Sequence, residues 1–472
     1  MWRFIVSICL YFSILSFLNA QSASGLYLGP YSGINGVLIN PASSRSYPMK
    51  WDLNIASLNS FGHTDYVFVK ETNLFHLLRN LNNFQRLPLD PIADPADPNT
   101  LYYDFPLEAF NTTASFLLEV NGPGFLFNSE KFSIGIFSRL RANGGSHSIP
   151  SSLSYFGIQS SFTNTEIVSG KASASGLYWS EYGITLSSDQ LLPLEGISIG
   201  INIKYNRAHQ GVFAKSFDEF SYNRISNDSL ILSQPQFEFG ITSVSADDPS
   251  INLSNNGSGF STDIGISTSL PKGLLNFSIL DIGVVSVKNG EVYTLQSSQD
   301  LLIDTDAITN ATNIRDQINE IDQQVSNQLD RITTIQSGNQ FNIGLPTRIH
   351  IDYTYDFKND RSILVSIDQR IPLFPNSLEA ENVITFAPRY ENKWWMITTP
   401  ISIYEYSKIR VGLAAKMGFL TIGTDHIASL IGKSDFRGSS FYAGLKFFPF
   451  WNTYNKNSSK SNRGSNVICP LN

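Results

Sequence analysis

Histidine and carboxylate pairs are the first residues to weigh for chemistry in this sequence. His350 and Asp352 lie two residues apart, which places both on one face of an extended strand. Such a pair would suit metal binding or proton transfer, but a solvated pair in a polar lumen is the favoured interpretation. Asp425 and His426 are adjacent and would point to opposite faces of a strand, which disfavours a joint catalytic role.

No enzyme signature accompanies these residues. The sequence lacks H-E-x-x-H, G-x-S-x-G, a phosphate-binding glycine loop and paired cysteines. We therefore expect no enzymatic activity, no metal site and no cofactor. The net charge of −7 argues against nucleic acid as a partner, because that partner requires a basic surface.

Ten charged or titratable residues alternate with isoleucine, phenylalanine and tyrosine, and we expect them to face a polar lumen. On a lipid-facing wall each Arg or Lys would cost roughly 2–4 kcal/mol at the bilayer midplane. Mixed signs suggest salt bridges that brace the wall or hold a plug, and the alternative is a polar permeation path. The residues are Arg139, Arg141, Lys204, Asp263, His350, Asp352, Asp356, Asp368, Arg370 and Lys446.

The elements that carry these residues have a period of two. Residues 197–206 and 348–357 alternate between apolar and polar side chains without a break. Charged residues make up only 15% of the chain and aromatic residues 12%. These features predict an all-β fold, a transmembrane antiparallel β-barrel of about 14 strands. A soluble secreted β-protein is a weaker alternative.

The connections support a barrel over residues 49–450. Tight turns such as 271–273 and 358–361 alternate with the long stretches 62–111, 142–174, 208–257 and 288–341, which we place on the outer face.

The two ends of the chain differ from the barrel. Residues 1–20 have one positive charge, a short apolar stretch and Ala20 before Gln21, which predicts a cleaved signal peptide and export to the outer membrane of a Gram-negative bacterium. An uncleaved anchor is the alternative. Residues 21–48 are rich in Gly, Ser and Pro and predict an N-terminal plug, or else a linker. Residues 451–472 form a polar C-terminal tail.

Two outer stretches have helical periodicity. Residues 73–81 predict a short amphipathic helix, and 305–336 predict a longer one. Its single apolar stripe could pack over the barrel mouth, bind a protein partner or dimerise. The stripe consists of Ile314, Ile318, Ile321, Val325, Leu329 and Ile332.

Three short segments carry a resemblance to a known family. Residues 36–42, with Gly36, Asn40, Pro41 and Ala42, resemble the hatch of FadL-like outer-membrane barrels, and 200–205 resemble their middle strand. The runs 420–426 and 441–446 look like the end of an uncharacterised branch, a domain of unknown function related in look to the PorV barrel. One departure is that the last strand is followed by a polar tail.

The resemblance implies a fourteen-stranded barrel with an N-terminal plug. It favours a passive channel for hydrophobic or amphipathic small molecules, which would pass the hatch from an outer cleft. The alternative is an outer-membrane scaffold or secretion-associated barrel that binds a protein through its outer loops and the 305–336 helix. Outer-membrane lipid is an expected partner in either case.

Overall fold

A computed structural model describes residues 23–80, 83–86, 100–106, 111–152, 166–191, 196–226, 229–243, 245, 252–305, 308, 314–328, 338–357 and 359–449. The expected signal peptide (1–20) and C-terminal tail (451–472) lie outside these residues. Within them, no helix is long and apolar enough to cross a bilayer.

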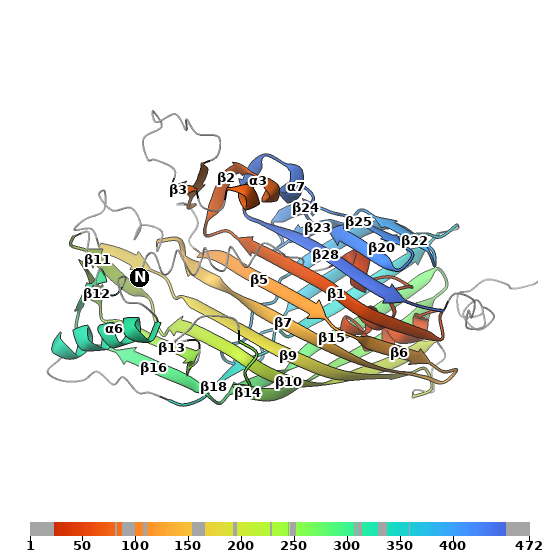
Figure 1. Cartoon of the computed structure of the whole chain (residues 1–472), viewed down its shortest axis with the longest axis horizontal. Helices are drawn as coiled ribbons and strands as arrows, with labels where there is room; N and C mark the ends of the chain where they lie inside the picture. Colours follow the sequence, from red (N-terminus) through yellow and green to blue (C-terminus); the bar gives the residue numbers. More distant parts are fainter. Residues whose placement is uncertain are drawn as a thin grey trace, which may run out of the picture.

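Most described strands belong to one antiparallel sheet that closes on itself. Strand β1 pairs with the last strand, β28, on one side and with β5 and β6 on the other. Figure 1 shows the strands running obliquely around a cylinder. Because the sheet closes, its first and last strands pair with each other and neither presents an open edge. This confirms the predicted antiparallel barrel.

The strands of the barrel sheet are β1 (Trp51–Thr64), β5 (Asn111–Asn121), β6 (Gly124–Asn128), β7 (Phe132–Pro150), β9 (Ser173–Ser188), β10 (Ile197–Ser216), β13 (Gln236–Thr242), β14 (Gly257–Leu270), β15 (Gly273–Val287), β16 (Gly290–Gln296), β18 (Phe341–Gly344), β19 (Arg348–Asp356), β20 (Arg361–Arg370), β21 (Val383–Glu391), β22 (Trp395–Thr398), β23 (Ile401–Tyr404), β24 (Lys408–Val411), β25 (Leu413–Met417), β26 (Leu420–Thr424) and β28 (Gly438–Phe447).

The sheet is divided into 20 strands, where the sequence predicted about 14. Part of the difference comes from interruptions. Strands β5 and β6 continue one register along β1 and are separated by Gly122 and Pro123. Pro400 likewise separates β22 from β23, since proline has no N–H to donate to a ladder. Strands β13 and β16, which flank β14 and β15 in the chain, form a further antiparallel pair within stretches that the sequence predicts as loops.

The barrel wall is apolar outside and polar inside. On β10, Ile203 is 55% exposed, whereas the next residue, Lys204, is fully buried. A soluble protein would show the opposite arrangement, because burying an ammonium is costly. Isoleucine, leucine and aromatic side chains are exposed on most of the other barrel strands as well. We call this exposed apolar surface the belt.

Two small sheets extend one end of the barrel, which we call the outer end. The first has the order β17 (Leu301–Asp304), β12 (Ser229–Ser233), β11 (Phe220–Arg224) and β8 (Glu166–Ser169). The second has the order β27 (Ser434–Phe436), β2 (Phe68–Thr72), β4 (Leu101–Asp104) and β3 (Phe84–Arg86). Helices α3 (Leu74–Arg79), within the predicted helix 73–81, and α7 (Ala428–Ile431) lie beside the second sheet (Figure 1).

The helix predicted over 305–336 is α6 (Ile314–Gln328). Val325 and Ile321 pack with apolar residues of the first small sheet. Gln324 and Gln328 accept hydrogen bonds from the N–H groups of Asp304 and Leu302 at the sheet edge, each at 2.8 Å. The helix therefore covers an edge strand, and this part of its apolar stripe packs against the protein itself.

Residues 23–49 fill the barrel interior as a plug. They contain three short helices, α2 (Ser24–Tyr27), η1 (Gly33–Leu38) and η2 (Pro41–Ser46). These helices contact strands on several sides of the barrel, among them β10 and β14 around η2 and β26 and β28 around α2. Plug residues such as Ile34 and Val37 share one apolar core with inward wall residues such as Leu126 and Tyr442.

Candidate functional site

The plug has an irregular backbone, and side chains of the wall satisfy it. Asn202 donates to the Val37 carbonyl at 2.8 Å, and Ser278 donates to the Ile39 carbonyl at 2.6 Å. A buried carbonyl without a partner would cost about 1–3 kcal/mol. These wall groups therefore fix where the plug can rest.

Two cationic side chains of the barrel wall donate hydrogen bonds to the backbone at the start of the plug, over residues 24–32. Arg389 donates to the carbonyls of Ser24, at 2.6 Å, and Leu28. Lys446 donates to the carbonyls of Tyr31 and Ser32, the latter at 2.9 Å. Because the accepting atoms are backbone oxygens, these hydrogen bonds hold the plug backbone in position against the wall.

The turn at Asn40 and Pro41 packs most closely against the wall. Asn40 Oδ1 accepts from the Ala42 N–H at 2.9 Å, and Asn40 Nδ2 donates to the Ile266 carbonyl at 3.1 Å. A Cβ on Gly200 would lie 2.4 Å from the backbone of residues 41 and 42, and one on Gly265 would lie 2.0 Å from Asn40 Oδ1. Only glycine leaves room for this turn.

The plug also forms hydrogen bonds and an ion pair at the end of the barrel opposite the outer end. Tight turns such as 271–273 join the strands there, and we call it the short-turn end. Ser44 Oγ lies 2.5 Å from Ser187 Oγ on β9. Arg45 donates to the carbonyls of Ser129 and Glu130 and lies 2.9 Å from Asp189. The plug is thus held along most of its length. The expected hatch residues Asn40, Pro41 and Ala42 lie at its closest contact with the wall, and Gly36 lies within η1 against Ser32 and Ser43.

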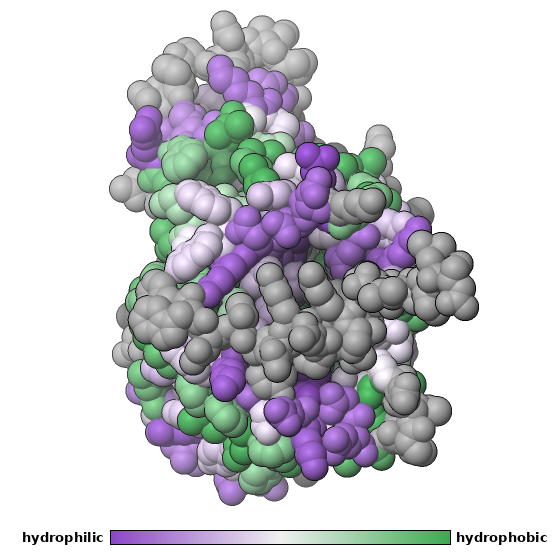
Figure 2. All heavy atoms as spheres, turned by 90° about the vertical axis from the view of Figure 1, so that its right-hand side faces the viewer, coloured by the Kyte–Doolittle hydropathy of each residue, from purple (hydrophilic) through white to green (hydrophobic). Residues whose placement is uncertain are grey.

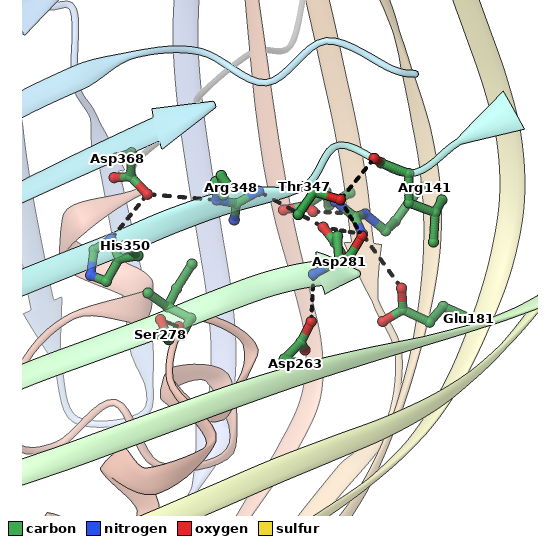
Figure 3. Close-up of polar contacts among 12 residues, drawn as sticks. Arg141, Glu181, Asp263, Ser278, Asp281, Thr347, Arg348, His350 and Asp368 are labelled. Carbon is green, nitrogen blue, oxygen red and sulfur yellow. Dashed lines mark hydrogen bonds and ion pairs between the residues drawn. The ribbon is translucent and has the colours of Figure 1, made fainter. Parts of the chain in front are cut away.

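A buried ion cluster crosses the lumen on the outer side of the plug. Arg141 lies 3.0 Å from Glu119 and 3.1 Å from Asp281, and Arg139 lies 2.5 Å from Glu181. Figure 3 shows Arg141, Glu181 and Asp281 pointing toward one another from different strands. Side chains of this set are buried, and their opposite charges are adjacent.

The cluster continues around the wall, from β10 to β19, through Asp281. Lys204 lies 2.5 Å from Asp281 and 2.6 Å from Asp263, and Arg348 lies 3.8 Å from Asp281 (Figure 3). Four cations therefore meet four carboxylates, counting Arg139, Arg141, Glu119 and Glu181. Such pairing is what a fixed brace requires, because a buried charge without a partner is strongly destabilising.

His350 lies between two carboxylates, 3.1 Å from Asp352 and 3.0 Å from Asp368. Asp356 lies at the short-turn end and lines a small cavity beside the plug. Arg370 lies at the outer end of β20, 3.3 Å from Glu379. The structure thus brings Arg139, Arg141, Lys204 and Asp263 into one cluster and leaves Asp356, Arg370 and Lys446 apart from it.

Several residues of this interior were missed at the level of sequence. Glu181 alternates with Tyr182 and Ile184 on β9, so the same period-two rule could have found it. Arg389 and Glu391 alternate in the same way with Tyr390. Asp281 carries no such signal, since it stands at an irregularity where β15 shifts register against β14 and its φ is +56°.

The outer half of the lumen is closed by apolar side chains. Trp179, Phe213 and Val285 belong to a buried cluster there, with Leu378 from the connection between β20 and β21. The amide of Leu378 donates to the Gly344 carbonyl at 2.8 Å, and Ser175 donates to the Ser377 carbonyl at 2.8 Å. Residues 371–382 therefore form a strap bonded to the wall.

Two carboxyl groups outside the strands have shifted acidity. Burial, followed by the charge of Glu405, raises the pKa of Glu381 in the strap to about 8. Burial raises the pKa of Asp425, which follows β26, to about 6. Tyr404 donates to Glu381, so this carboxyl group ties the strap to β23. Its protonation state thereby affects the strap.

The space left beside the plug is small. A cavity of about 40 Å³ lies between the plug and strands β15 and β19, with Asn40, Asn276 and Asp352 in its lining. This volume holds water but no hydrocarbon solute. In the described residues, no group of three His, Cys, Asp or Glu side chains is placed to hold a metal ion.

Comparison with known proteins places the chain in a family. No curated protein matches it. Among solved structures it is similar to the TodX deltaS2S3 mutant monoaromatic hydrocarbon channel, with 9% identity, a TM-score of 0.43, and coverage of 91% of this chain and 97% of that one. It is also similar to a Pseudomonas aeruginosa FadL homologue, with 11% identity, a TM-score of 0.41, and coverage of 91% and 98%. The model of a family of unknown function, DUF5723, matches residues 41–425, which is most of the sequence, and the chain therefore belongs to the DUF5723 family.

Proposed function

We propose that the protein is a passive outer-membrane channel for hydrophobic or amphipathic small molecules, and that residues 23–49 act as its hatch. The observation that carries this proposal is a plug joined to the wall by hydrogen bonds and ion pairs. The plug leads into the first barrel strand at residue 50 and contributes no strand to the barrel sheet, so it can move without breaking the sheet.

Three features support the membrane setting and the need for movement. The belt exposes side chains such as Ile203, at 55%, that water would disfavour. Polar side chains of the strands face the interior, as the buried Lys204 does. The cavity described beside the plug is too small for an organic solute, so passage at this place requires the plug to shift. The solute class rests on the resemblance of residues 36–42 to a hatch and on the apolar outer lumen.

A reversible lock tests the hatch directly. Ser44 and Ser187 have their hydroxyl oxygens 2.5 Å apart, so the pair Ser44→Cys and Ser187→Cys should form a disulfide between plug and wall. In proteoliposomes we expect uptake of a hydrophobic aromatic probe to stop on oxidation and to return on reduction. The single variant Ser44→Cys is the matched control and should respond to neither treatment.

Uptake that persists with the disulfide formed would show that the plug does not gate passage. Absence of uptake by the wild-type barrel, with or without residues 21–47, would count against transport altogether.

The second candidate is a scaffold that binds a protein at the outer end. The observation that favours it is the amount of structure there, with two small sheets and α6 beyond the barrel. The described part of the α6 stripe packs on the first small sheet, so a partner would have to use other surfaces of residues 305–336. A co-purifying protein that is lost when 305–336 are removed would support this candidate.

A further inference from the structure

An exposed apolar face lies outside the barrel wall, on the pair of helices α3 and α7. We call this pair the overhang. Asn73 holds it together, since its Oδ1 accepts from the His76 N–H at 3.0 Å and its Nδ2 donates to the Gly432 carbonyl at 3.1 Å. The same side chain thus caps the start of α3 and bonds the end of α7. The two helices therefore present one fixed surface.

Helix α3 has apolar residues on two faces. Leu74 and Leu77 are buried, whereas Phe75 is 56% exposed and Leu78 is 42% exposed. On α7, Ile431 is 71% exposed. Phe75 and Leu78 are three residues apart and share one exposed face of α3, and exposed large apolar side chains of this kind mark an interaction site. Figure 2, seen from the short-turn end, shows hydrophobic surface between the hydrophilic tip of the upper lobe and the barrel.

The overhang is bonded to a strand of the belt. The residue just before α7, Ile427, donates its N–H to the Val411 carbonyl on β24 at 2.8 Å. Val411 is 46% exposed and Ile409, on the same face of that strand, is 73% exposed. Helix α7, which carries the exposed Ile431, therefore follows directly from a residue bonded to a strand that exposes apolar side chains of the belt. A partner that covers the belt can cover the overhang as well.

Charged groups border the overhang. Arg79 follows Leu78 directly, and Lys433 lies two residues after Ile431, and both are exposed. Long basic side chains beside apolar ones suit a phosphate layer above acyl chains. Two acidic residues are also exposed nearby, Glu71 and Asp435, and the Asp435 carboxylate accepts from the Glu71 N–H at 3.5 Å.

We propose that the overhang inserts Phe75, Leu78 and Ile431 into the boundary between headgroups and acyl chains of the outer leaflet. Arg79 and Lys433 then contact the lipid phosphates. The lipid surface is favoured over a second copy of the chain because α7 is attached to a strand whose apolar side chains belong to the belt. This inference rests on the proposed membrane location of the barrel. It assigns to the outer loops an anchor on one side of the barrel.

The test places a fluorescent reporter on the overhang. The full chain with Phe75→Trp is reconstituted in vesicles of phosphatidylcholine and phosphatidylglycerol that carry bromine near the headgroup or near the chain end. We expect the added emission to fall about twofold with bromine near the headgroup and less with bromine near the chain end. Ile431→Trp should respond in the same way.

The control is Val168→Trp, a position 65% exposed on β8 of the first small sheet, whose emission should not change. Native Trp395 lies in the belt at 55% exposure and reports whether the barrel is inserted. If the native emission is quenched while Phe75→Trp behaves like Val168→Trp, the overhang does not touch lipid and the inference fails. If neither is quenched, the membrane location itself is wrong.

A second copy on the overhang would give a different result. The added emission would be insensitive to bromine, and the protein mass in detergent would halve on Phe75→Ser. That outcome would also overturn the lipid assignment.

Discussion

Replacing Gly200 by alanine should loosen the plug without opening the barrel sheet. The Cβ of this residue would lie 2.4 Å from the carbonyl carbon of Pro41 and from the amide nitrogen of Ala42. Ordinary contacts of a Cβ begin at 3.4 Å. Because both neighbours are backbone atoms, no side-chain rotation relieves the overlap, and the turn must move by about 1 Å.

The size of the effect follows from what that movement breaks. Overpacking of this kind costs about 1–3 kcal/mol. The bond from Asn40 Nδ2 to the Ile266 carbonyl, now 3.1 Å, would stretch beyond hydrogen-bonding distance and cost about 1 kcal/mol more. A total of about 2–4 kcal/mol would raise the open fraction of the plug at least about 30-fold.

Hydrogen exchange measures this fraction. The amides of Ile39, Asn40 and Ser43 donate within the plug and should exchange faster in Gly200→Ala by that factor. Amides of β10 and β14 should keep their protection. Probe uptake into proteoliposomes should rise with the exchange rate if the plug is the hatch.

The matched control is Gly176→Ala on the neighbouring strand β9. The tightest contact of a Cβ there is with Val212 Cγ1, at 3.2 Å, and the nearest backbone atoms lie at an ordinary 3.9 Å. Plug exchange in Gly200→Ala that equals the exchange in wild type and in Gly176→Ala would refute the reasoning. The turn would then tolerate displacement, and its fit against the wall would have no role in closure.

Further predictions concern the groups that hold the plug, the cluster and the strap. Arg389→Lys should speed exchange of amides near Ser24, because one ammonium cannot reproduce a fork that reaches two separated carbonyls. Asp281→Asn should destabilise the barrel by about 3–5 kcal/mol, seen as a lower temperature of heat-modified gel mobility, because three cations lose their shared carboxylate. The raised pKa of Glu381 means that the folded state holds this proton more tightly than the unfolded state, so stability should fall as pH rises from about 4.5 to about 8. Glu381→Gln should flatten that fall in thermal melts between these pH values, and a wild-type profile without the fall would contradict the assignment.

The sequence alone was enough to determine the wall. Alternation is a local property, so residues such as Ile203 and Lys204 could be assigned to opposite faces from their neighbours in the chain. The same rule placed Arg139, Arg141 and Asp263 on the inner face. The amphipathic period of 305–336 indicated the helix, although only the structure shows which surface its stripe covers.

Strand irregularities were beyond the reach of that rule. The register of β10 shifts around His209, and that of β15 shifts around Asp281. Beyond each shift the inward face changes from even to odd positions, so Phe213 and Val285 face inward. A bulge depends on which strand lies opposite and in what register, and a single strand carries little record of its partner.

The pairing within the ion cluster and the contacts between plug and wall are decided by tertiary structure, for the same reason. Arg141, Lys204 and Asp281 come from separate strands, and neither their distances nor their pairing can be read from the sequence. Gly200 and Gly265 could be seen as glycines on an inner face, but their contact with residues 40–42 exists only once the chain end has folded back into the lumen. Period-two alternation is set by bonds along the chain, whereas closure of the lumen is set by contacts between segments that the closed sheet brings together.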